Sequence, residues 1–261
     1  ILLAGLAALA VMVAYNFYEI KKFDVSPRGV IEEKNNSNQS SNFAKENNRE
    51  DLGNRENDSM AEENKEKEEA IIPSEYYLAV PFTSQAPYAD WSEPWQNACE
   101  EAAILMVHNY YQGGGEIAPE RAVNELGSMV DWQINNWGGH FDLNAEEIAK
   151  LARDYYGYKD VEVIYSPTLE DIRRLLASGV PLVAPAAGRE LHNPQYTPPG
   201  PYYHNLLVKG YNQYQIITND MGTAWGNDYS YNNDVFMAAL HDFDEHDILG
   251  MPEAVVAIHK Q

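Results

Sequence analysis

The chain has 261 residues with a single cysteine, and its 40 acidic and 18 basic residues give a net charge of −22. One cysteine excludes an intramolecular disulfide framework and a cysteine-rich zinc module. The acidity excludes nucleic acid as a partner, because binding to phosphates requires clusters of lysine and arginine.

Residues 1–22 are typical of a membrane anchor or a signal segment. The run 1–15 is apolar apart from a terminal tyrosine hydroxyl, and aromatic residues and then two lysines follow it. A membrane span needs about 20 apolar residues, whereas the core of a cleaved signal peptide has about 7–15. Aromatic residues followed by cations favour the interface of a membrane. We expect a single N-terminal anchor in the cell membrane with the following domain extracytoplasmic, and secretion after cleavage is the alternative.

Residues 23–70 predict a disordered tether that is acidic and rich in asparagine. They include 13 acidic residues, seven basic residues and nine asparagines, and residues 35–42 consist only of Asn, Ser and Gln. Such a segment cannot bury enough apolar surface to offset the entropy lost on ordering.

Residues 71–261 are long enough for one folded domain and carry 26 acidic and nine basic residues. We expect, in chain order, an edge strand over 77–82, helices over 99–111, 145–156 and 169–178, and strands over 180–187, 203–211, 215–219 and 254–259. Residues 132–139 are expected to form a loop that ends in two glycines.

These elements follow from periodicity and from end signals. Apolar residues recur at helical spacing after Cys99, and Asn144 and Thr168 each precede an acidic residue by three positions, as in a capping box. The strands on either side of residues 212–213 predict a hairpin. Helices dominate the first half and strands the second, so the sequence predicts an α+β fold with N-terminal helices packed on an antiparallel sheet from the C-terminal half.

Cys99 is the first candidate for a reactive group. A lone cysteine is usually a small buried apolar residue. However, Cys99 falls where a helix begins, and a helix N-terminus stabilises a thiolate and offers free N–H groups to an oxyanion. Glu100 and Glu101 act in the opposite direction, because acidic neighbours raise the pKa of a thiol.

His204 is the histidine best placed to serve as a base, because it opens a strand after a proline-rich loop. A turn at 212–213 brings this strand start beside the end of the next strand, which carries Asn219 and Asp220. Positions 204 and 220 are therefore expected to be near neighbours, as an orienting group and an imidazole must be. Strand alternation allows only one of Asn219 and Asp220 to face His204.

The order of these motifs resembles the C39-like cysteine peptidases over about residues 77–258. The resemblance rests on the block Val-Pro-Phe-Thr-Ser-Gln that ends at Gln85, on Cys99 at a helix start, and on His204 separated by five residues from Gly-Tyr, with Asn-Asp further on. It implies a papain-like fold in which Cys99 is the nucleophile, His204 the general base and Asp220 the orienting group. It also implies that Gln85 donates to the oxyanion hole.

The chain departs from the family pattern in two places. Glu100 and Glu101 stand where the family often has Gly-Pro, and the gap between Gln85 and Cys99 is long. Gln96, three residues before the cysteine, is therefore the rival oxyanion donor. Asn219 is in the same way the rival orienting residue to Asp220.

Tryptophans and an acidic loop complete the set of candidate residues. Four tryptophans in expected loops are equally consistent with core packing and with walls of a substrate cleft: Trp91, Trp95, Trp137 and Trp225. The run 241–247 combines histidine with aspartates, but its spacing matches no standard calcium loop. We expect no metal and no cofactor.

The sequence thus predicts an extracytoplasmic cysteine hydrolase that cleaves peptide bonds through an acyl-enzyme. Amide hydrolysis or transpeptidation of cell-wall peptides on the same site is an alternative, since an anchor and a tether would place the domain near peptidoglycan. A catalytically inactive surface binding module is a second alternative, favoured by the glutamates beside Cys99. A peptide or cell-wall peptide is the expected partner, together with the membrane through the N-terminal segment.

Overall fold

The computed structural model describes residues 72–261. The predicted anchor at 1–22 and tether at 23–70 lie outside these residues. Within the described part of the chain, no helix combines the length and apolar character needed to cross a membrane.

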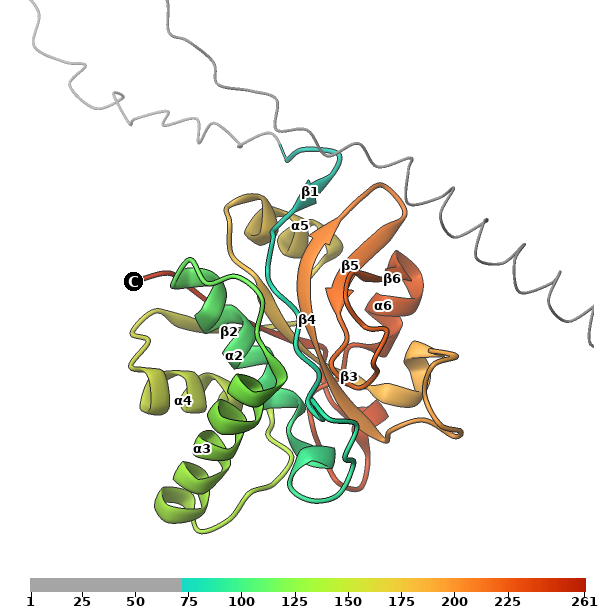
Figure 1. Cartoon of the computed structure of the whole chain (residues 1–261). Helices are drawn as coiled ribbons and strands as arrows, with labels where there is room; N and C mark the ends of the chain where they lie inside the picture. Colours follow the sequence, from blue (N-terminus) through green and yellow to red (C-terminus); the bar gives the residue numbers. More distant parts are fainter. Residues whose placement is uncertain (1–71) are drawn as a thin grey trace, which may run out of the picture. The chain divides into compact units, whose positions relative to one another are not determined.

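An antiparallel sheet forms the centre of the described domain (Figure 1). Its strands are β1 (Tyr76–Tyr77), β2 (Val161–Tyr165), β3 (Leu182–Ala187), β4 (Tyr203–Tyr211), β5 (Gln215–Asn219), β6 (Tyr229–Asn232) and β7 (Ala254–Ile258). The order across the sheet is β2-β7-β3-β4-β5-β6, and β1 pairs with the end of β4. Every residue of the central strands β3 and β4 is buried, so the sheet centre is also the core.

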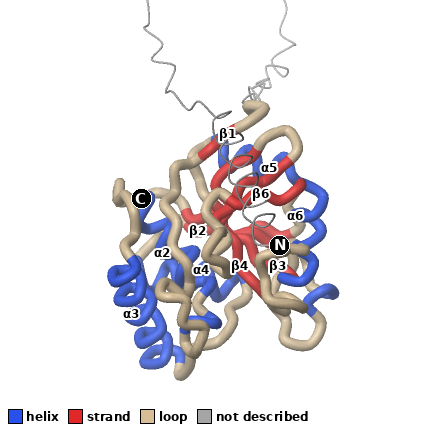
Figure 2. The backbone as a smooth tube through the Cα atoms, turned by 45° about the vertical axis from the view of Figure 1, so that its right-hand side comes forward, coloured by secondary structure: helices blue, strands red, loops and turns tan. Residues whose placement is uncertain are grey.

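Helices cover both faces of this sheet. They are α2 (Cys99–Tyr111), α3 (Pro119–Trp137), α4 (Ala145–Tyr156), α5 (Leu169–Ala177) and α6 (Asn233–Ala239). α2 packs on β3 and β4, α4 packs on β2 and β7, and α3 lies on α2. α5 contacts β1, β3 and β4, and α6 contacts β5 and β6. Figure 2 shows α2, α3 and α4 gathered on one side of the strands, away from α5 and α6. The α+β prediction is confirmed.

Local end signals explain where the helices begin. Asn144 and Thr168 form complete capping boxes with Glu147 and Asp171, as predicted. α2 has no side-chain cap, and every residue from its start to Val107 is buried. Tertiary packing therefore holds the start of α2, and this packing fixes the position of Cys99.

The structure corrects two predictions in the helical half. The strand expected at 77–82 stops at Tyr77, because the carbonyl groups of Val80 and Pro81 accept side-chain donors instead of strand partners. The loop expected at 132–139 is wrong, since α3 runs through to Trp137. Gly138 then ends the helix with φ of 84°, a left-handed conformation that glycine adopts without strain.

The predicted hairpin is confirmed in its strand bounds but not in its register. β4 and β5 are joined by three residues, and the side chain of Asn212 accepts the N–H groups of Tyr214 and Gln215. A bulge between Val208 and Gly210 then moves the pairing back by one residue. Residue 219 therefore lies opposite Leu207, one position from the pairing with Leu206 that a two-residue turn would give.

Candidate active site

A cleft of about 1010 Å³ contains both Cys99 and His204. The first comes from the start of α2 and the second from the start of β4, so two parts of the chain that are far apart in sequence meet there. The segment 82–97 and the loop 195–203 supply much of the rest of its wall. The predicted nucleophile and base thus share one cavity.

Cys99 is buried, and its sulfur is engaged by a carboxyl group. Sγ donates to Glu100 Oε2 at 3.0 Å, and Asn205 Nδ2 lies 3.7 Å from the sulfur. Burial raises the pKa of the Cys99 thiol well above its ordinary value, and the charge and hydrogen bond of Glu100 raise it further. The rise in the thiol pKa expected from the acidic neighbour therefore outweighs the decrease expected from the helix N-terminus.

His204 is held in the geometry expected of an oriented base. Its Nε2 lies 2.9 Å from Asp220 Oδ1, and both residues are buried. Bonding of Nε2 to Asp220 leaves Nδ1 as the ring nitrogen available to a substrate or a thiol. The predicted proximity of 204 and 220 holds despite the altered register, because the two residues are diagonal rather than direct neighbours across the hairpin.

Sequence reasoning missed the residues that hold Asp220. Its Oδ2 accepts Tyr231 at 2.6 Å, Tyr196 at 2.7 Å and Asn193 Nδ2 at 2.9 Å. Tyr196 also meets the His204 ring edge-on at a centroid distance of 5.6 Å. These donors come from a proline-rich loop and from β6, and no local periodicity links either of them to Asp220.

The surroundings of Asp220 keep it ionised. Burial would raise the pKa of this carboxyl, but His204 and the tyrosine hydroxyls outweigh burial and lower it. A negative charge at this point stabilises the imidazolium that forms when His204 takes up a proton.

Asn219, the rival orienting residue, lies on the other side of β5. Its Nδ2 donates to the carbonyl groups of Val80 and Pro81, and its Oδ1 accepts Lys209 Nζ. Asn219 therefore fastens the 80–81 segment to the sheet and does not contact His204.

The two rival oxyanion donors are both occupied. Gln85 is buried, and its Nε2 donates to the carbonyl groups of Trp95 and Gln96 at 3.1 and 2.9 Å. Gln96 Nε2 donates to Glu93. Both glutamines line the cleft, but Gln85 must release a backbone partner before it can donate to an oxyanion. The first N–H groups of α2 have no acceptor within the helix and are alternative donors.

The four candidate tryptophans divide into two pairs. Trp91 and Trp225 line the cleft and are 42% and 75% exposed. Trp95 and Trp137 both pack against the core, and the ammonium group of Lys150 lies over the Trp137 ring. Of the two interpretations left open for these tryptophans, core packing applies to Trp95 and Trp137, and neither lines the cleft.

The acidic loop does not form a metal centre. Asp242 is buried and accepts the backbone N–H groups of Ala145 and Phe243, which uses its carboxylate for local structure. Across residues 72–261, no group of His, Cys, Asp and Glu is arranged to hold a metal ion.

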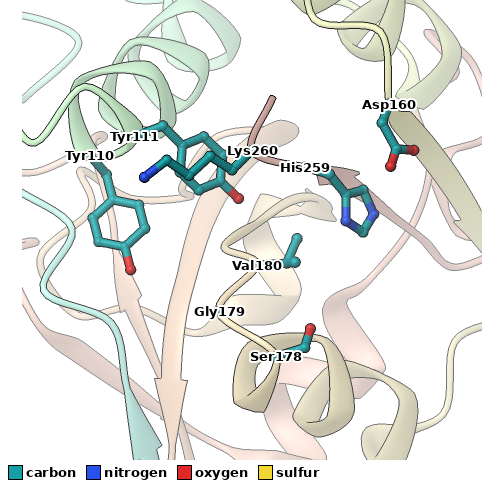
Figure 3. Close-up of a pocket in the computed structure, with 8 residues that line it drawn as sticks. All are labelled: Tyr110, Tyr111, Asp160, Ser178, Gly179, Val180, His259 and Lys260. Atoms are coloured by element: carbon teal, nitrogen blue, oxygen red, sulfur yellow. The ribbon is translucent and has the colours of Figure 1, made fainter.

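A second cavity of about 550 Å³ lies between α2, the end of α5 and the C-terminal residues (Figure 3). Figure 3 shows Asp160, Ser178 and His259 around it. Ser178 donates to the carbonyl group of Leu175, so its hydroxyl is not paired with a base. This cavity lacks the nucleophile and the oriented histidine that the larger cleft contains.

Comparison with known proteins agrees with the motif analysis. A family model described as the Peptidase_C39 like family matches residues 77–245, which is more than half of the chain. No curated protein matches the chain. A solved structure from Bacillus anthracis, described as a candidate C39-like peptidase, is similar at 15% identity and a TM-score of 0.49, over 72% of this chain and 99% of that one. The resemblance predicted from the sequence is confirmed.

Proposed function

Because the chain belongs to the Peptidase_C39 like family, we propose that the cleft hydrolyses peptide bonds with Cys99 as the nucleophile. His204 is the general base and Asp220 orients it. The observation that carries this assignment is the His204–Asp220 hydrogen bond of 2.9 Å, made by a histidine that lines the same cleft as Cys99.

The reaction proceeds in two halves. The thiol proton passes from Sγ to the imidazole of His204, and the thiolate attacks the carbonyl carbon of the peptide bond. The C–N bond breaks as the imidazolium returns its proton to the leaving amine, which leaves an acyl group on Cys99. His204 then activates a water molecule, and hydrolysis of the thioester frees the enzyme.

The first test is hydrolysis of a fluorogenic peptide library by the wild type, C99A and H204A. We expect both variants to lose about 10³-fold or more in kcat, because each removes one half of the nucleophile–base pair. The acyl-enzyme is expected as a mass increase on the wild type that is absent from C99A. Hydrolysis that survives in C99A would exclude the mechanism.

A binding module without catalysis is the second candidate, and the Cys99–Glu100 hydrogen bond favours it. A thiol held by a carboxyl group and raised in pKa is a weak nucleophile. The discriminating measurement is the iodoacetamide rate of folded Cys99 against that of a free thiol. A rate no faster than the free thiol, together with peptide binding that survives in C99A, identifies the binding module.

The site of action is part of the proposal. The apolar and basic pattern of residues 1–22 supports an extracytoplasmic domain that is either membrane-anchored or secreted, and a cell-wall peptide is then the accessible substrate. Amide hydrolysis or transpeptidation would use the same acyl-enzyme, with water or an amine as the acceptor. Product analysis of stem-peptide digests with and without an added amine acceptor distinguishes the two reactions.

A further inference from the structure

The mechanism above makes no use of the carboxyl group that touches its nucleophile. Glu100 follows Cys99 in the first turn of α2 and has no exposed surface. Its Oε2 accepts the thiol at 3.0 Å and its Oε1 accepts the backbone N–H of Leu143 at 2.9 Å. Neither partner is a cation, so no direct contact balances a negative charge on this carboxyl group.

The titratable groups around Glu100 mostly add negative charge. On α2, Glu101 is also fully buried and is partnered by His140. Asp142 approaches from the loop before α4, and Tyr203 approaches from β4. Burial raises the pKa of Glu100 well above its usual range, and the charges of Glu101 and Asp142 raise it further.

A thiolate on Cys99 and a carboxylate on Glu100 cannot coexist in this buried site. Like charges at hydrogen-bond distance repel strongly where water is excluded. We propose that Glu100 is a positioning residue that governs the charge of the nucleophile: ionised Glu100 accepts a hydrogen bond from the thiol and keeps the proton on Cys99, whereas neutral Glu100 allows the thiolate to form. This inference rests on the proposed function and adds to it a group that decides when the nucleophile is present.

The proton balance sets the direction of the pH dependence. When Glu100 is protonated, the thiol proton moves to His204, and the site holds one thiolate and one imidazolium. When Glu100 is ionised, the same transfer would place a second negative charge 3.0 Å from the first, so the proton stays on Sγ. The reactive pair is therefore present below the raised pKa of Glu100 and is lost as the pH rises through it.

The test is the alkylation rate of the single cysteine by iodoacetamide in the full chain, compared between the wild type and E100Q. Glutamine keeps the shape and an acceptor for Leu143 but carries no charge. We expect equal rates while Glu100 is protonated in the wild type, and about tenfold faster alkylation of E100Q once the pH has risen through the raised pKa of Glu100, since one pKa unit changes the thiolate fraction about tenfold. A ratio that stays at or below one across the whole titration overturns the proposal.

E101Q is the matched control. It removes the same charge from the same buried turn, but Glu101 contacts Gln133 and His140 rather than the sulfur. We expect a smaller gain in alkylation rate than in E100Q. Equal gains in the two variants would assign the effect to total charge and overturn the role of the direct contact.

A second measurement needs no substitution of Glu100. The infrared S–H stretch of the wild type, taken as the difference from C99A, is expected at the position of a hydrogen-bonded thiol once the pH has risen through the raised pKa of Glu100. Absence of this band from folded wild type at every pH overturns the proposal even where E100Q does not fold.

Alkylation and infrared spectra require no substrate, so the two proposals fail separately. If peptide hydrolysis depends on Cys99 but the alkylation rate is the same in the wild type and E100Q, the peptidase is retained and the role of Glu100 is rejected. If the alkylation rate depends on Glu100 but no peptide is hydrolysed, only the peptidase is rejected.

Discussion

At the scale of single residues, Asp220 is the group on which the proposed base depends most. We expect D220N to lower kcat by on the order of 10²-fold or more, because an amide whose oxygen keeps the donors to Oδ2 turns its NH2 group toward His204 and carries no charge to stabilise the imidazolium. The variant is also expected to lose roughly 1–3 kcal/mol of stability, since Tyr231, Tyr196 and Asn193 lose a charged acceptor. Peptide hydrolysis and urea unfolding measure the two effects.

The pH dependence of that stability has a definite sign. The pKa of Asp220 is lowered in the folded state, so its contribution is present above the unfolded-state pKa and is lost as the pH falls through the folded value. The wild type should therefore lose its stability advantage over D220N in acid. Y231F, which removes one donor to Asp220 but keeps the carboxylate, is the control and should retain most of the activity. A D220N variant with wild-type kcat would contradict the assignment.

The structure resolves the choice between Asn219 and Asp220, which strand alternation had reduced to one of the two. Alternation gives no such help with Gln85 and Gln96. Neighbouring residues of a strand point to opposite sides. Asp220 bonds to His204, and Asn219 donates to the carbonyl groups of the 80–81 segment. The choice between Gln85 and Gln96 depends on the loop between Gln85 and Cys99, whose course follows no periodicity. The burial of Glu100 was also beyond sequence analysis, because acidic residues in a first helical turn are normally solvated.

At the scale of elements, the start of α4 supports the loop that reaches Glu100. Asn144 caps α4 and follows Leu143, whose N–H donates to the Glu100 carboxyl group. We expect N144A to lose about 1 kcal/mol of stability, the usual cost of removing a cap. T168A, at the capping box of α5, should lose a similar amount. Urea denaturation compares both with the wild type, and a loss well below 0.5 kcal/mol in each would show that packing alone fixes these helix ends.

Elements with strong local signals could be predicted from the sequence almost to the residue. α2, α4, β4 and β5 have the predicted bounds, because apolar spacing marks α2, a capping box starts α4 and turn residues separate β4 from β5. α3 was missed because Gly127 lies inside it and two asparagines near its end lower the local helix propensity. The bulge in β4 could not be predicted, since bulges follow from pairing across the sheet rather than from local sequence.

At the scale of the whole molecule, the cleft shares the acidic character of the chain. Its wall includes the carboxyl groups of Glu116 and Asp142 and the imidazole of His204, and no lysine or arginine lines it. Burial raises the pKa of Asp142, so this carboxyl group contributes a negative charge only above a higher pH than an ordinary aspartate needs. A cavity walled by one sign of charge focuses its potential and attracts ligands of the opposite sign.

We therefore expect the cleft to favour peptides that carry a positive charge near the scissile bond. Matched peptides with lysine, glutamine or glutamate at the same position should be hydrolysed in that order of kcat/KM. The difference should arise mainly in KM and shrink as salt is added, because screening weakens attraction between charges that are not in direct contact. D142N should reduce the preference for lysine over glutamine. Faster hydrolysis of the glutamate peptide would show that contacts with Trp91 and Trp225, rather than the field of the cleft, select the substrate.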